Sequence, residues 1–236
     1  MIINLDNQKI FGLYILIFLN WKRFKRIAFP MESNKSTQES IILDHGFERL
    51  ITDGVRAFTV ENLAGCLCMS KKTIYKFFPT KEALIDKIVS FRLSQIEAEI
   101  KTVMESESNP IHRFLGVMNI FYNSTAKLKI EQIGELKNRY PMMWKRIETF
   151  RLNRREDFYF ILKNAQEKGL VRKNLDVDLI ATIYANIINS TFQPEFFIEN
   201  SLLPKIVLPA FVELVSGGLL SEEGQAYYQQ IKGSTS

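Results

Sequence analysis

Apolar residues recur along most of this chain with the spacing of an amphipathic helix. In residues 37–53, for example, six apolar side chains return near the helical period of 3.6 residues, namely Ile41, Ile42, Leu43, Phe47, Leu50 and Ile51. No segment shows the sustained alternation of apolar and polar residues that predicts a β-strand. The pattern therefore predicts an all-α protein.

Residues that cap helices divide this pattern into separate elements. Thr59, Ser70 and Thr80 are N-cap candidates, because their hydroxyls can accept a hydrogen bond from the first turn of a helix. Asn109 followed by Pro110 is typical of an N-cap with proline at the first helical position. The predicted helices span residues 37–53, 60–67, 71–77, 81–105, 110–128, 130–140, 141–168, 178–193 and 204–215.

These helices group into two units. Residues 31–80 form a small unit of three short helices, and residues 81–236 form a long helix followed by a larger helical bundle. The large number of aromatic residues, with 18 Phe and 8 Tyr, supplies enough apolar area for a helical core. We expect the long helix, residues 81–105, to connect the two units.

Residues 1–30 differ from the rest and are interpreted as an extension. Their apolar run, residues 10–19, is shorter than the roughly 20 residues that a membrane-spanning helix needs. Basic residues follow the run instead of preceding it, unlike a signal peptide. Met31 begins a polar stretch typical of a cytosolic protein, so we expect a mis-assigned start. The alternatives are an anchor at the membrane surface and an extension that does not touch a membrane.

The net charge of +5 is concentrated in this extension. Residues 1–30 contain five basic residues and one acidic residue, Asp6, which gives a net charge of +4. The remainder of the chain is therefore close to neutral. Any basic surface on the remainder must therefore be local. The 2 Cys residues, Cys66 and Cys68, are too close together to join distant parts of the fold and fit a reducing, cytoplasmic setting.

Such a local basic surface is predicted where two short helices, residues 60–67 and 71–77, follow one another. No acidic residue occurs between Asn62 and Lys81. A short helix of this kind fits the major groove of DNA, where its first residues reach base edges and its lysines contact phosphates. The alternative is an ordinary solvated helix face. The lysines concerned are Lys71, Lys72, Lys76 and Lys81.

Residues 59–84, which read TVENLAGCLCMSKKTIYKFFPTKEAL, resemble the signature region of TetR-family transcriptional regulators. The resemblance implies an N-terminal three-helix DNA-binding unit with a helix-turn-helix, joined by a long helix to a C-terminal helical bundle for ligand binding and dimerisation. The residues to which it assigns contacts with double-stranded DNA are Thr59, Ser70, Lys71, Lys72, Thr73, Tyr75, Lys76 and Lys81.

Three residues depart from the family pattern. Cys68 stands where the family often has glycine, and it would be strained if the turn needs a positive φ. Lys72 also replaces a frequent glycine, and Phe77 replaces a frequent histidine.

The resemblance also implies a small-molecule pocket in the C-terminal half. Candidate lining residues on the predicted helices are Tyr122, Tyr140, Trp144 and Phe158, although core packing is the alternative for each. The broad apolar stripes of residues 178–193 and 204–215 would form the interface of a family-like homodimer. Such a dimer would place two recognition helices about 34–36 Å apart, to match a palindromic operator.

The sequence thus favours a sequence-specific, cytoplasmic, homodimeric repressor that a small-molecule effector releases from DNA. Ligand binding would move the helix of residues 81–105 and change the spacing of the two recognition helices. The alternatives are a helical ligand- or partner-binding protein with a vestigial DNA head, and a regulator tethered to a membrane through residues 10–26. With 2 His and no glycine-rich phosphate loop, we expect no enzyme, no catalytic residue, no metal site and no cofactor.

Overall fold

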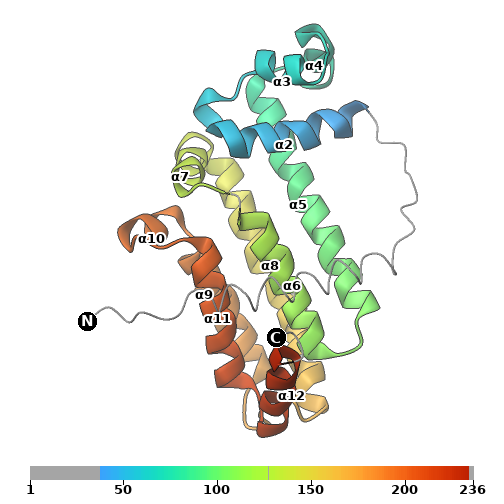
Figure 1. The fold of residues 1–236 in the computed structure, drawn as a ribbon, viewed down its shortest axis with the longest axis vertical. Helices are drawn as coiled ribbons and strands as arrows, with labels where there is room; N and C mark the ends of the chain where they lie inside the picture. The colour runs from blue at the N-terminus through green and yellow to red at the C-terminus, as the bar shows by residue number, and fades with distance from the viewer. Residues whose placement is uncertain (1–37, 127, 234–236) are drawn as a thin grey trace.

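The computed structural model describes residues 38–126 and 128–233, and the regular elements of these residues are all helices (Figure 1). The predicted all-α fold is confirmed. Beyond the helices, one isolated antiparallel bridge joins Val171 to Leu220 in the described part of the chain. The interpretation of residues 1–30 lies outside the described residues.

The N-terminal head consists of α2 (Gln38–Ala57), α3 (Val60–Cys66) and α4 (Lys71–Phe77). Thr59 caps α3 by accepting a hydrogen bond from the Asn62 amide at 3.1 Å. Ser70 caps α4 by accepting one from the Thr73 amide at 3.1 Å. The two predicted N-caps are confirmed. They fix the entry of each short helix, which satisfies backbone donors that have no partner inside a helix.

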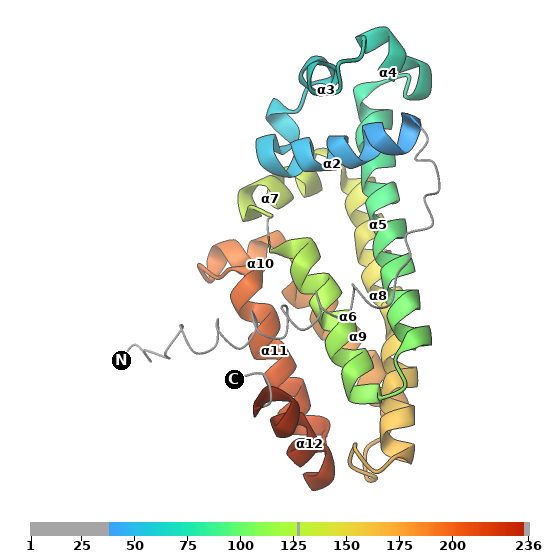
Figure 2. The ribbon, with the colours of Figure 1, turned by 45° about the vertical axis from the view of Figure 1, so that its right-hand side comes forward.

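The C-terminal half begins with the long helix α5, which descends from the head and lies along the bundle (Figures 1 and 2). Thr80 caps it, accepting a hydrogen bond from the Ala83 amide at 3.0 Å. The helices of this half are α5 (Lys81–Ser106), α6 (Pro110–Thr125), α7 (Ile130–Arg139), α8 (Pro141–Glu167), α9 (Val177–Thr191), α10 (Pro194–Glu199), α11 (Pro204–Leu219) and α12 (Glu222–Gly233).

Two apolar cores hold these elements. The head core contains the inner faces of α2, α3, α4 and the start of α5, with Ile42, Leu63 and Ile74 fully buried. It also includes Met143 from α8, so the head is packed onto the bundle rather than hinged from it by a linker. The bundle core is built by α5, α6, α8, α9, α11 and α12 and is rich in aromatic rings.

The sequence analysis misplaced several boundaries in the described region. The predicted break before Gly54 is present, since Gly54 has non-helical backbone angles, φ 80° and ψ 164°, but a further helical segment of α2 continues to Ala57. α11 runs on to Leu219 rather than residue 215. The short helix α10 and the C-terminal helix α12 were not predicted, because α10 is brief and α12 is largely polar. None of the helices in the described part of the chain is long and apolar enough to cross a membrane.

The placement of α12 depends on a close approach at Gly224. A Cβ added there would overlap the carbonyl oxygen of Leu170. This oxygen belongs to the backbone and cannot rotate away as a side chain could. We predict that Gly224→Ala lowers the free energy of unfolding by about 1–3 kcal/mol, measured by chemical denaturation. The control is Gly65→Ala in α3, where an added Cβ meets nothing within 4 Å and should raise stability by up to about 1 kcal/mol. If Gly224→Ala changed the free energy of unfolding in the same way as Gly65→Ala, the result would contradict this packing.

Candidate nucleic-acid interface and ligand cavities

The turn between α3 and α4 reverses the chain within a few residues. Cys68 has a φ of 51°, in the left-handed region that favours glycine. The Met69 amide donates to the Ala64 carbonyl oxygen at 2.9 Å, which closes the turn. The turn therefore has the positive φ that would explain the frequent glycine of the family pattern. Holding Cys68 in this conformation costs about 1–2 kcal/mol of folding free energy.

The helix that follows this turn, α4, is anchored on one side and open on the other. Ile74 is fully buried in the head core, and Phe78 just beyond the helix is buried too, as predicted. Thr73 is half-buried, and its hydroxyl lies 2.9 Å from that of Ser70. The side chains that α4 leaves exposed are those of Lys71, Lys72, Tyr75, Lys76 and Phe77. Lys71, Lys72, Tyr75 and Lys76, four of the residues predicted to contact DNA, thus lie exposed on one helix at the end of the molecule (Figure 2).

The four lysines of this surface are not equivalent. Lys71 Nζ lies 2.6 Å from Glu61 Oε1 of α3. This contact lowers the pKa of the Glu61 carboxyl and raises the pKa of the Lys71 ammonium. Lys72 and Lys76 have no ion pair within the described residues. The predicted phosphate contact of Lys71 would therefore require it to leave Glu61, whereas Lys72 and Lys76 have no such ion pair to give up.

Lys81 stands apart from the recognition helix at the start of α5. Its Nζ donates to the Val55 carbonyl oxygen at 3.4 Å and lies 5.9 Å from the centre of the Phe58 ring. The side chain is half-buried and ties α5 to the end of α2. Lys81 thus joins the head to the long helix, and its phosphate contact stays a prediction.

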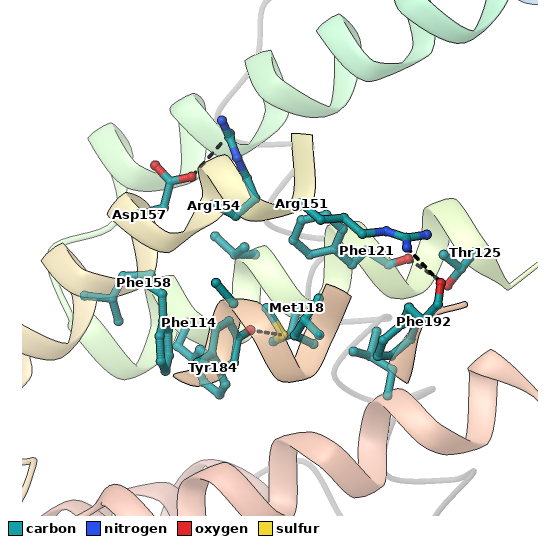
Figure 3. Close-up of a pocket in the computed structure, with 15 residues that line it drawn as sticks. Phe114, Met118, Phe121, Thr125, Arg151, Arg154, Asp157, Phe158, Tyr184 and Phe192 are labelled. Carbon is teal, nitrogen blue, oxygen red and sulfur yellow. Dashed lines mark hydrogen bonds and ion pairs between the residues drawn. The ribbon is translucent and has the colours of Figure 1, made fainter. Parts of the chain in front are cut away.

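The C-terminal half contains two neighbouring cavities. The first, named here the inner cavity, has a volume of about 70 Å³ and lies among α6, α8 and α9 (Figure 3). The second, named the seam cavity, has a volume of about 180 Å³ and lies between the head and the bundle, with walls from α2, α5, α6, α7 and α8. Both are lined mainly by apolar side chains, as pockets for small organic ligands are.

The structure does not bring the four predicted pocket residues into one site. Phe158 lines the inner cavity and Trp144 lines the seam cavity. Tyr122 lies at a smaller hollow beside Leu208 and lines neither cavity. Tyr140 packs against the head core and also lines neither, because it stands at the junction of α7 and α8 near the head.

The charged groups of the inner cavity other than Arg151 form ion pairs, although Arg154 Nε and Asp157 Oδ2 have no hydrogen-bond partner among the described residues. Arg154 lies 3.2 Å from Glu97 of α5 and 3.2 Å from Asp157. Burial raises the pKa of the Asp157 carboxyl, although Arg154 opposes the rise. The Tyr184 hydroxyl contacts the Met118 sulfur at 3.3 Å, and burial raises the pKa of Tyr184. These groups hold α5, α8 and α9 in place.

Arg151 is the polar residue that the sequence analysis missed. It lines both cavities, and its Nη1 donates to the Phe192 carbonyl oxygen at 2.8 Å (Figure 3). A signal was available in the sequence, because Arg151 lies seven residues after Trp144 and seven before Phe158, on the apolar face of one helix. An arginine on such a face is unusual and points into the protein.

Comparison with known proteins agrees with the geometry of the head. Residues 42–88, which cover α3, α4 and most of α2, match the family described as bacterial regulatory proteins, tetR family. An uncharacterised HTH-type transcriptional regulator of Bacillus subtilis, YvaF, is 23% identical over 176 residues, which are 74% of this chain and 92% of that protein. The HTH-type transcriptional repressor KstR2 of Mycobacterium tuberculosis is 25% identical over 131 residues, which are 54% of this chain and 66% of the repressor.

Solved structures share the fold of most of this chain. The structure of KstR2, a ketosteroid transcriptional regulator, matches with a TM-score of 0.51 at 20% identity and covers 80% of this chain and 98% of its own. A regulator from Saccharomonospora viridis, solved in complex with choline, matches with a TM-score of 0.61 at 12% identity and covers 78% of this chain and 98% of its own. At these identities the structures establish the fold, and the two sequence relatives are HTH-type transcriptional regulators.

The strained turn at Cys68 generates a prediction with opposite signs at two neighbouring cysteines. We predict that Cys68→Gly leaves the free energy of unfolding unchanged or raises it by up to about 1 kcal/mol, since glycine removes the left-handed strain. Cys66→Gly, at the end of α3, should instead lower it by about 0.5–1 kcal/mol. Denaturation under reducing conditions measures both, and equal losses would show that the turn carries no strain.

Proposed function

Because the chain is a DNA-binding transcriptional regulator of the TetR family, we propose that it acts in the cytoplasm as a homodimeric repressor. In this proposal the dimer binds a palindromic operator through α4, and a small-molecule effector that enters the C-terminal half releases it. The observation that carries the proposal is the exposed basic face of a rigidly anchored α4. Lys72 and Lys76 on this face can displace counterions from DNA phosphates.

The proposed dimer rests on apolar side chains that the single chain leaves exposed. Leu179, Ile183 and Ile187 recur every four residues on α9 and are 54%, 45% and 41% exposed. On α11, Leu214 is 72% exposed, and the contact between the rings of Tyr184 and Phe211 joins the two helices. A stripe of this kind favours burial against a second copy, and it supports the predicted interface at residues 178–193 and 204–215.

The proposed release mechanism uses the contacts between the head and the bundle. α5 belongs to both units, and Gln132 of α7 donates to the Thr52 carbonyl oxygen of α2 at 3.3 Å. The seam cavity is walled by these same three helices. A ligand that binds only when they move apart would shift α5 and the spacing of the two α4 helices, and operator affinity would fall.

The DNA-binding role is tested by replacing Lys71, Lys72 and Lys76 with alanine. The assay is an anisotropy titration over several salt concentrations, with DNA from immediately upstream of the gene. We predict that affinity falls by at least about tenfold and that the log–log salt slope drops by about 0.9 for each phosphate that a lysine no longer neutralises. The control variant replaces three exposed lysines of the bundle with alanine, namely Lys101, Lys163 and Lys173.

An unchanged affinity and salt slope in the head variant would mean a vestigial DNA head, which leaves a helical ligand- or partner-binding protein. Equal losses in the head and bundle variants would mean that general charge, rather than α4, attracts DNA. Either result contradicts the proposal.

The dimer interface is tested by placing a charge in the exposed stripe of α9. We predict that Ile183→Glu weakens the dimer at least about 100-fold, because two unpaired carboxylates would be buried at the symmetric contact. Light scattering after size-exclusion chromatography at micromolar concentration should then show monomers. Met142→Glu on α8 is the control, since Met142 is 76% exposed and lies outside the stripe. A dimer that survives Ile183→Glu would place the interface elsewhere.

A further inference from the structure

The inner cavity and the seam cavity meet at a single cationic side chain. Phe121, Thr125, Arg151 and Phe192 line both cavities, so these four residues form the junction between them. Figure 3 shows Arg151 extending toward Thr125 and Phe192 at this junction. Arg151 is the only formally charged residue among the four, and the walls on either side of it are mainly apolar.

Arg151 forms no ion pair with the described residues. Its guanidinium makes one hydrogen bond, to the Phe192 carbonyl oxygen, and lies 5.1 Å from the centre of the Trp144 ring. No carboxylate of the described residues lies within 4.0 Å of it, whereas Arg154 on the next turn has two such partners. Burial lowers the pKa of Arg151 to about 10, a fall that the charge of Glu148 partly offsets.

Glu148 is the nearby acid, and its carboxylate is held by other donors. Its Oε1 accepts hydrogen bonds from Trp144 Nε1 at 2.9 Å and from Gln193 Nε2 at 3.0 Å. A guanidinium has five N–H donors in a planar fork, and the Phe192 carbonyl uses one direction. The remaining donors suit a carboxylate, which an arginine can bind with two parallel hydrogen bonds.

We propose that the effector is an amphipathic carboxylate whose anionic group binds Arg151 at the junction and whose apolar body fills the cavities on either side. The inference rests on the proposed function in taking the C-terminal half as the effector-binding part. The larger seam cavity receives most of the apolar body, and Arg154, which lines the inner cavity alone, is paired with Asp157 at 3.2 Å and with Glu97 at 3.2 Å. The charged group thus sets which molecules bind, and the apolar contacts set how tightly.

The test compares decanoate with decanamide, which has the same chain and shape without the charge. Trp144 fluorescence reports binding because its ring lies beside Arg151, and Trp21→Phe removes the other of the 2 Trp residues. We expect decanoate to bind at least about tenfold more tightly than decanamide. Each further methylene should tighten binding by about fourfold until the cavities are full.

Substitutions assign the preference to Arg151. Arg151→Gln should remove the preference for decanoate over decanamide, and Arg151→Lys should keep part of it. Arg155→Gln is the matched control, because Arg155 lies on the same helix, pairs with Asp178 and lines neither cavity. A purely structural Arg151 would change the melting temperature in Arg151→Gln and leave the preference for the acid intact.

The proposal is overturned if wild-type protein binds decanoate and decanamide equally, binds neither, or binds decyltrimethylammonium more tightly than both. It is also overturned if the preference for decanoate survives Arg151→Gln. Operator binding by the same preparations without ligand is measured separately. A preparation that prefers decanoate but does not bind the operator would refute the proposed function and leave the carboxylate site standing. A preparation that binds the operator but shows no preference for decanoate would refute only this inference.

Discussion

The rest of the structure depends on the continuous burial between the DNA-binding head and the bundle. Met143 of α8 is 3% exposed within the head core, and Leu136, Tyr140 and Ile147 pack around the same core. Burying side chains of this size stabilises the contact by roughly 1.5–3 kcal/mol each. The head is therefore packed directly against α7 and α8. In the proposed mechanism, a change in the bundle that displaces these helices is passed to the head and to α4.

This seam also explains where a regulatory ligand can act. In a close-packed interior, the atoms that line a cavity lack packing neighbours on the cavity side. A ligand provides these neighbours only when the surrounding helices adopt an arrangement that the ligand fits. The seam cavity lies where α2, α5 and α7 meet, and it shares the junction residues, Arg151 among them, with the inner cavity. In the proposed mechanism, a ligand in either cavity would therefore act on the seam. The packing across the seam would then pass the movement to the DNA-binding head.

Local chemistry made the head predictable from the sequence. Thr59, Ser70 and Thr80 cap helices through hydrogen bonds to residues three positions away, so neighbouring residues alone determine these starts. The cavities could not be predicted in this way, because their walls come from helices far apart in the chain. Tyr140 shows the difficulty, since its spacing suits the pocket helix while its position near the head directs it to another core. The polar helix α12 was missed because its packing depends on the close approach at Gly224.

Two features of the head and bundle work against stability and mark the functional regions. Cys68 holds a backbone conformation suited to glycine, and Arg151 holds a half-buried charge without an ion-pair partner among the described residues. Departures of this kind are expected where a protein must bind something else. One lies in the turn that sets the angle of α4, and the other lies where the two cavities meet.

The central claim is that α4 reads DNA sequence as part of a symmetric dimer. The most direct measurement is selection of bound duplexes from a pool of random sequence, with the full chain and non-specific competitor DNA. The account predicts enrichment of an inverted repeat whose half-sites are separated by about one helical turn or a multiple of it. Enrichment of no sequence, or of a single site without symmetry, would contradict it.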